Sequence, residues 1–197
     1  IAVTGDVGEP YEVIKKRTEH VTGTLKNALE KSSTYDGADN KDPNPTPALR
    51  YNIVDTIEHK EAVPIKARAG KPTYPDYAGV MTRHDICTYV TEKNVKEVWL
   101  WAYQGPARPS DGQAYLGIYE SKMSGPQGDI SNSGRENDLP NCGKTYRVYT
   151  FNYQRSTSEA LESWGHQLEA ELSAVDTALF RTKFQGVPFP RVTKETG

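Results

Sequence analysis

Hydrophobic residues recur with helical spacing in two long segments of the chain. The first segment, residues 10–31, places its apolar residues near one face of a helix, although Gly23 could divide it. The second segment begins at Ser156, where Glu159 three residues later completes a capping box. From there, apolar residues recur at spacings of three and four over about five turns. This apolar stripe consists of Leu161, Trp164, Leu168, Leu172, Val175 and Leu179.

Apolar runs and alternating patterns predict strands between these two helices. The predicted strands are 49–57, 96–103, 113–121 and 144–153. A short predicted helix, 84–95, leads directly into the second strand, a junction typical of α/β proteins. Segments rich in Pro, Gly, Asp and Asn predict loops at 32–48, 60–80, 104–112 and 122–143. This order favours an α/β fold with a mixed sheet of three or more strands, flanking helices and long loops.

Length and composition narrow the class of protein. The 197 residues predict one α/β domain over 1–197, and leave open that the chain is a fragment of a longer secreted protein. The formal net charge of −2 gives no basic field, which argues against a nucleic-acid partner. No apolar run approaches the roughly 20 residues of a membrane span, so no membrane partner is expected. The 12 tyrosines indicate half-exposed aromatic surface.

The two cysteines, Cys87 and Cys142, bear on the compartment. They form either one disulfide or two unpaired, small hydrophobic residues. The chain starts at Ile1 and not at Met, which fits removal of a signal or pro-segment as well as an arbitrary boundary. A disulfide would accompany export, and we expect a secreted protein.

His166 lies between two carboxylates on the last predicted helix. Glu162 precedes it by four residues and Glu169 follows it by three, spacings at which helical side chains touch. Three interpretations remain open. The residues form an ordinary solvated helix face, or Glu162, His166 and Glu169 bind a divalent metal, or His166 acts as a general acid or base. The metal is the only cofactor that the sequence leaves open.

Polar residues also follow the predicted strands. If the strands run parallel, four of these residues converge at one sheet edge, near the start of the last helix. These four are Gln104, Glu120, Asn152 and Arg155. If 113–121 instead pairs antiparallel with 144–153, Glu120 moves to the other end. Glu120 follows an apolar strand, so it is either a general acid or base with a pKa raised by burial, or an ordinary strand-edge residue.

Trp99 and Trp101 alternate with Val98 and Leu100, so each pair faces one side of the sheet. Core packing explains the tryptophans. The alternative is that an exposed Trp101 stacks on a sugar ring.

Three pieces of sequence carry a resemblance to a known family. EVWLWAY, YLGIYESKMSGPQGDISNS and FNYQRSTSEALESWGHQLEAEL follow one another in this order. They resemble a family of secreted bacterial and fungal proteins with the patterns YES-x-M-x-GP, FNY-x-R and GH-x-x-E, and the resemblance covers residues 95–172. It carries no catalytic role. It implies export, and it implies that the strand-end and helix residues belong to one site.

Two main hypotheses follow, and both take a small molecule or a polymer, such as a glycan, as the ligand. In the first, an extracellular hydrolase uses Glu120 and His166 for acid–base chemistry, while Gln104, Asn152 and Arg155 orient the substrate. In the second, a non-catalytic module binds carbohydrate through Trp101. A third hypothesis is a metal-binding protein that uses the last helix.

Overall fold

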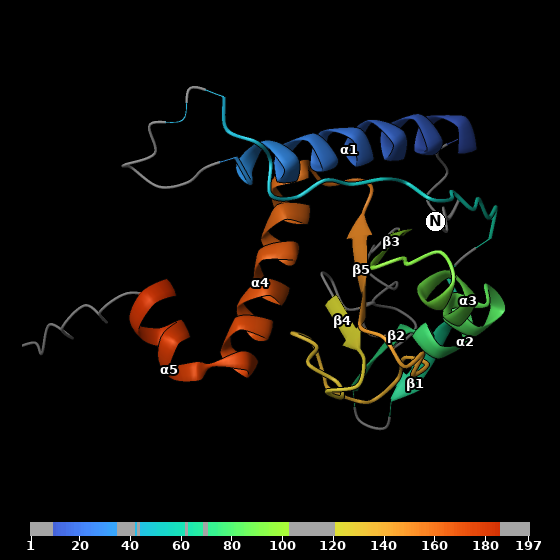
Figure 1. Ribbon diagram of the computed structural model, residues 1–197. Helices are drawn as coiled ribbons and strands as arrows, with labels where there is room; N and C mark the ends of the chain where they lie inside the picture. The colour runs from blue at the N-terminus through green and yellow to red at the C-terminus, as the bar shows by residue number, and fades with distance from the viewer. Residues whose placement is uncertain are drawn as a thin grey trace, which may run out of the picture.

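The computed structural model describes residues 10–34, 42, 44–61, 63–68, 71–102 and 121–185. Its helices and strands follow in the order α1 (Tyr11–Ser32), β1 (Ile65–Arg68), β2 (Lys71–Pro75), α2 (Tyr77–Arg83), α3 (Ile86–Thr91), β3 (Glu97–Ala102), β4 (Ser121–Ser124), β5 (Tyr146–Asn152), α4 (Thr157–Val175), α5 (Thr177–Leu179) and η2 (Phe180–Phe184). Figure 1 shows their arrangement.

A three-stranded mixed sheet forms the centre, with the strand order β3-β5-β4. β3 runs parallel to β5 with Glu97 opposite Arg147, and β4 runs antiparallel to β5 with Ser121 opposite Tyr149. A separate antiparallel pair is formed by β1 and β2. The expected α/β fold with a mixed sheet and flanking helices is confirmed.

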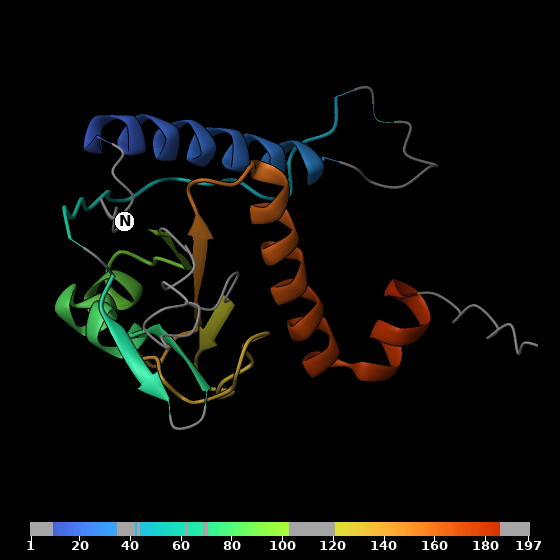
Figure 2. The same cartoon turned by 180° about the vertical axis from the view of Figure 1, so that it is seen from behind.

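Two hydrophobic cores lie on opposite faces of the sheet, because side chains alternate along each strand. Leu100 and Ala102 of β3 pack with residues of α2 and α3, whereas Trp99 and Trp101 pack with residues of α1 and with Ala160 of α4. Seen from both sides, α4 and the α2–α3 pair lie on opposite sides of β5 (Figures 1 and 2). The alternation expected for β3 is therefore present.

Some predicted elements were wrong. The segment 49–57 forms no strand: its Tyr51 N–H donates to the Glu30 carboxylate (2.7 Å), and Ile53 and Val54 are exposed. The predicted loop 60–80 contains β1, β2 and most of α2, which the Asp76 side chain caps through the Gly79 N–H (3.1 Å). β4 occupies the start of the predicted loop 122–143. Tertiary pairing outweighs local composition in these segments.

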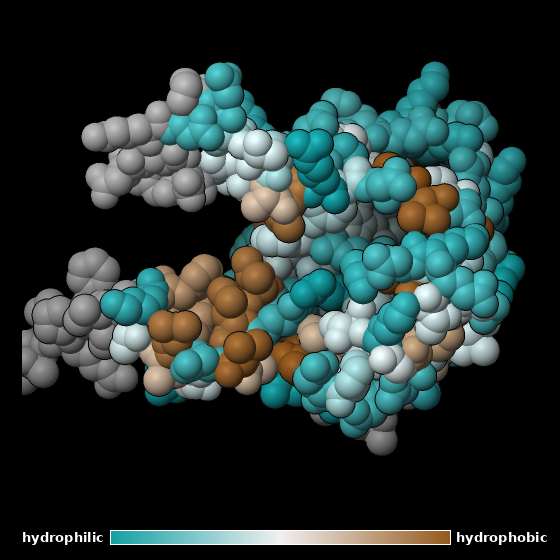
Figure 3. All heavy atoms as spheres, viewed as in Figure 1, coloured by the Kyte–Doolittle hydropathy of each residue, from teal (hydrophilic) through white to brown (hydrophobic). Residues whose placement is uncertain are grey.

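The last helix begins as predicted and ends early. The Ser156–Glu159 capping box is present, but Asp176 adopts an extended conformation (φ −153°). The Asp176 carboxylate then accepts a hydrogen bond from the Leu179 N–H (2.8 Å) and caps the start of α5. The apolar stripe therefore does not continue as one helix, and Val175 and Leu179 are exposed within the hydrophobic surface over α4 and α5 (Figure 3). None of the helices that the structure describes has the length and hydrophobicity to cross a membrane.

The disulfide is present. Cys87 in α3 is bonded to Cys142, 55 residues later, in the segment that leads into β5. The bond ties the α2–α3 layer to the sheet. It closes a long loop, so it removes much conformational freedom from the unfolded chain.

We expect the Cys87→Ala/Cys142→Ala double variant to lose roughly 4 kcal/mol of unfolding free energy, the chain-entropy value for a loop of this length. Urea denaturation at neutral pH measures the loss. Wild-type protein treated with a reductant is the control and should lose a similar amount. Equal midpoints for oxidised wild type and the double variant would contradict a stabilising bond.

Candidate functional site

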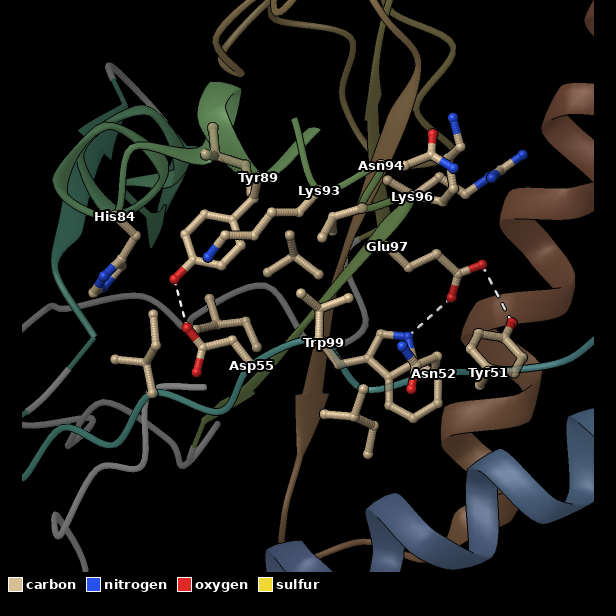
Figure 4. A pocket seen from close by; sticks show the side chains of 18 of the residues that line it. Tyr51, Asn52, Asp55, His84, Tyr89, Lys93, Asn94, Lys96, Glu97 and Trp99 are labelled. Carbon is tan, nitrogen blue, oxygen red and sulfur yellow. Dashed lines mark hydrogen bonds between the residues drawn. The ribbon is translucent and has the colours of Figure 1, made fainter. Parts of the chain in front are cut away.

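A groove of about 660 Å³ opens beside the N-terminal end of β3. Its walls come from the extended segment 49–57, from α2 and α3, and from the connection that leads into β3. Figure 4 shows this groove with its aromatic, aliphatic and charged side chains. The parallel register of β3 and β5 also brings Arg147 into the lining.

Glu97 is the first residue of β3, and its carboxyl group accepts hydrogen bonds from two aromatic side chains. Tyr51 donates its hydroxyl to Oε1 (3.2 Å), and Trp99 donates its indole N–H to Oε2 (3.0 Å) (Figure 4). Tyr51 and Trp99 also contact each other, with ring centroids 5.3 Å apart. The carboxyl is therefore fixed in position by two rings of the same groove wall.

Burial raises the pKa of Glu97 above its ordinary value of 4.5. The hydrogen bond from Trp99, the charge of Arg147 and the hydrogen bond from Tyr51 act in the opposite direction, but they do not offset the loss of solvation. Arg147 already forms a two-pronged ion pair with Glu171, which raises the pKa of the guanidinium. Its charge is therefore shared between two carboxylates, and the pKa of Glu97 stays raised.

Asp55 is a second carboxylate in the same groove, with the opposite tendency. The Tyr89 hydroxyl donates to Oδ2 (2.5 Å) and the Thr56 N–H donates to Oδ1 (2.7 Å). The hydrogen bond from Tyr89, followed by that from Thr56, lowers the pKa of Asp55. The groove thus contains two carboxyl groups whose pKa values are shifted in opposite directions, and opposite shifts of this kind occur in acid–base pairs.

A histidine pair lies at the α2–α3 end of the groove. The Nε2 atoms of His59 and His84 are 3.0 Å apart, and His84 lines the groove. Burial, followed by the charge of His59, lowers the pKa of His84. His59 Nδ1 lies 3.6 Å from the Glu61 carboxylate, which also pairs with Arg83. One proton shared between the two rings satisfies both facing nitrogens.

The described residues among those singled out from the sequence lie outside the groove lining. Gln104 and Glu120 fall outside the described residues. Trp101 is fully buried in the core under α1, and Asn152 is buried, its side-chain oxygen accepting from Gln154 N–H (2.8 Å). Arg155 is exposed in the turn before α4. None of the described residues in this set lines the groove, and whether Glu120 and His166 share a cleft stays a prediction.

The triad on α4 is a surface feature. His166 is half exposed; its Nδ1 lies 3.1 Å from Glu169 and its Nε2 lies 3.7 Å from Glu162. Each ring nitrogen thus faces a different carboxylate. Within the ranges that the structure describes, no three His, Cys, Asp or Glu side chains are arranged to hold a metal ion.

Glu97 was overlooked in the sequence because it stands at the edge of a predicted strand. Its position nevertheless carried a signal: it lies in phase with Trp99 and Trp101, the face that is buried under α1. A carboxylate in register with the buried Trp101 and the partly buried Trp99 has to be desolvated or paired. Asp55 had no such signal, because its segment resembled a strand.

The raised pKa of Glu97 predicts a specific pH dependence. The folded state binds the Glu97 proton more tightly than the unfolded state does, so this proton stabilises the folded protein at low pH. The stabilisation is lost as the pH rises from about 4.5, the ordinary carboxyl pKa, through the higher pKa of the folded state. We therefore expect wild type to lose unfolding free energy relative to Glu97→Gln over this window. Urea denaturation at a series of pH values measures the difference.

Glu58→Gln is the matched control. The Glu58 carboxylate accepts from Lys15 and Tyr11, and these hydrogen bonds lower its pKa. Wild type should therefore gain stability relative to Glu58→Gln as pH rises toward the ordinary carboxyl value. If the stability difference between wild type and variant changed with pH in the same direction for Glu97→Gln and for Glu58→Gln, Glu97 would not be desolvated as described.

No protein-family model, no curated protein and no solved structure matches this chain. The family resemblance of residues 95–172 therefore stays an expectation. The function has to be inferred from the contacts of the groove itself.

Proposed function

We propose that the chain is an extracellular glycan hydrolase whose groove beside β3 binds the sugar chain and whose Glu97 donates a proton to the leaving oxygen. The observation that carries the proposal is the carboxyl of Glu97, held by Tyr51 and Trp99 in a groove wall with its pKa raised by burial. A general acid needs a fixed position and a pKa raised toward the working pH, and this carboxyl has a fixed position and a raised pKa.

Asp55 is the partner carboxylate in this proposal. Hydrolysis of a glycosidic bond commonly uses one protonated carboxyl and one ionised carboxylate, the second acting as base or nucleophile. The hydrogen bond from Tyr89 lowers the pKa of Asp55, while burial raises the pKa of Glu97. The opposite directions of the two pKa shifts support this division of roles.

The remaining groove surface suits a sugar chain. Trp99 and Tyr51 provide aromatic surface, and Ile53 and Val54 are exposed beside them, with 54% and 45% of their surface accessible. Sugar rings present apolar C–H faces and hydroxyl edges, which match rings, aliphatic groups and nearby carboxyls. Five cationic side chains also line the groove, so acidic sugars are included among the candidates. They are Lys26, Arg50, Lys93, Lys96 and Arg147.

The Cys87–Cys142 disulfide supports the extracellular location. Disulfides persist in oxidising compartments and are rare in reducing ones. A polymeric glycan substrate is consistent with an exported protein.

The proposal is tested on a panel of neutral and uronate-containing polysaccharides, with released reducing ends and binding both measured. We expect wild type to release reducing ends, and Glu97→Gln to lose turnover by about 100-fold or more while still binding. Asp55→Asn should lose turnover as well. Glu58→Gln, an exposed carboxylate outside the groove, should keep the wild-type rate.

Other outcomes separate the competing hypotheses. Binding without turnover by wild type would favour a non-catalytic carbohydrate-binding module. Lost turnover in Glu120→Gln and His166→Gln, with an unchanged rate in Glu97→Gln, would move the chemistry to the pair singled out from the sequence. A panel with neither binding nor cleavage by wild type would overturn the glycan assignment.

A further inference from the structure

Lys122 in β4 carries an amine with no solvent exposure, and it does not belong to the groove lining. Its Nζ donates to the Gly134 carbonyl (2.6 Å) and lies 3.2 Å from Asp138 Oδ2 and 3.7 Å from Glu136 Oε2. The ring of Tyr77 lies 5.6 Å from the same nitrogen. A fully buried lysine is rare, and this one faces two carboxylates of a single loop.

The Asp138 carboxyl is almost as secluded. Its side chain is 7% exposed, and neither of its oxygens accepts a hydrogen bond within the described part of the chain, although Lys122 Nζ lies 3.2 Å away. The amine is thus in contact with the carboxyl group without the geometry of a hydrogen bond. A buried carboxylate whose lone pairs are unused is costly, so the ion pair alone is a poor explanation of the site.

We propose that Lys122 and Asp138 condense to an intramolecular amide, a covalent cross-link between β4 and the loop that precedes β5. Glu136 serves as the proton carrier. The proposal does not depend on the function of the groove.

The reaction balances without a co-reactant. The Lys122 ammonium passes a proton to Glu136 and becomes a nucleophilic amine. The new bond joins Lys122 Nζ to Asp138 Cγ, and the bond that breaks joins Cγ to one carboxyl oxygen. Two of the three ammonium hydrogens leave with that oxygen as water, and Glu136 returns one of these two. The positive and the negative charge are both removed, and one neutral amide remains.

Three features of the site favour this step. The amine and the carboxyl are held in contact by the fold, which replaces a bimolecular encounter with a reaction inside one chain. The surroundings are aromatic and dry, with Tyr77 and Tyr146 both fully buried. Condensation also removes the cost of keeping two ionised groups away from water, while the amide still offers an N–H to the Gly134 carbonyl.

The cross-link would add one more attachment to the long loop between β4 and β5. Gln167 of α4 already binds this loop: its Oε1 accepts from Asn132 N–H (2.9 Å) and its amide donates to the Ile130 carbonyl (3.0 Å). The disulfide at Cys142 holds the end of the loop. An amide at Asp138 supplies the third attachment, between those two.

Intact mass spectrometry of the purified, reduced and denatured protein tests the proposal. We expect a mass lower than that of the sequence by one water molecule. Tryptic digestion should leave the chain uncut after Lys122 and should join that peptide, through a branch, to the Glu136–Lys144 peptide. Wild type with the full sequence mass would overturn the proposal.

Three variants sharpen the result. Lys122→Arg should show its full sequence mass, because a guanidinium does not form this amide. Asp138→Asn should release ammonia in place of water and reach the same final mass as wild type. Glu136→Gln should stay at its full mass, and complete condensation in that variant would remove the role given to Glu136. A water loss that persists in Lys122→Arg would place the modification elsewhere and overturn the assignment.

Discussion

The pairing of β5 with a strand on each side is the interaction on which the rest of the structure depends. β5 is buried along nearly its whole length; its parallel neighbour β3 carries Glu97 and Trp99, and its antiparallel neighbour β4 carries Lys122. Because the register is fixed by backbone hydrogen bonds, a slip of one residue would exchange the two faces of a strand. The groove carboxyl and the buried lysine are therefore both positioned by the same strand.

Several polar groups in and beside this sheet are held in one paired network. Arg147 of β5 forms a two-pronged ion pair with Glu171 of α4, and Gln167, one turn before, binds both Glu171 and the backbone of the 125–143 loop. The buried side of α4 consequently contains Ser163 and Gln167, while parts of its apolar stripe face outward. Breaking one member of such a network leaves its partners buried without compensation.

The elements that the sequence predicted correctly are those whose signal is local. The capping box at Ser156 and the apolar runs of β3 and β5 depend on neighbours within a few residues, and they appear where expected. The segment 49–57 has strand-like composition, but its Tyr51 N–H is taken by the Glu30 carboxylate of α1. Contacts between distant segments, such as Tyr51 with Glu97, leave no periodic pattern, so the groove could not be assembled from the sequence.

Glu97 and Asp138 are two carboxyl groups that lose solvation on folding, and the consequence of this loss differs between them. Glu97 receives hydrogen bonds from Tyr51 and Trp99 and lines a groove, and there the lost solvation raises the pKa of the carboxyl. Among the described residues, none donates a hydrogen bond to the Asp138 carboxylate, which faces an amine that is itself excluded from water. There the cost is relieved by removing both charges together, because neither group can reach solvent or a better partner.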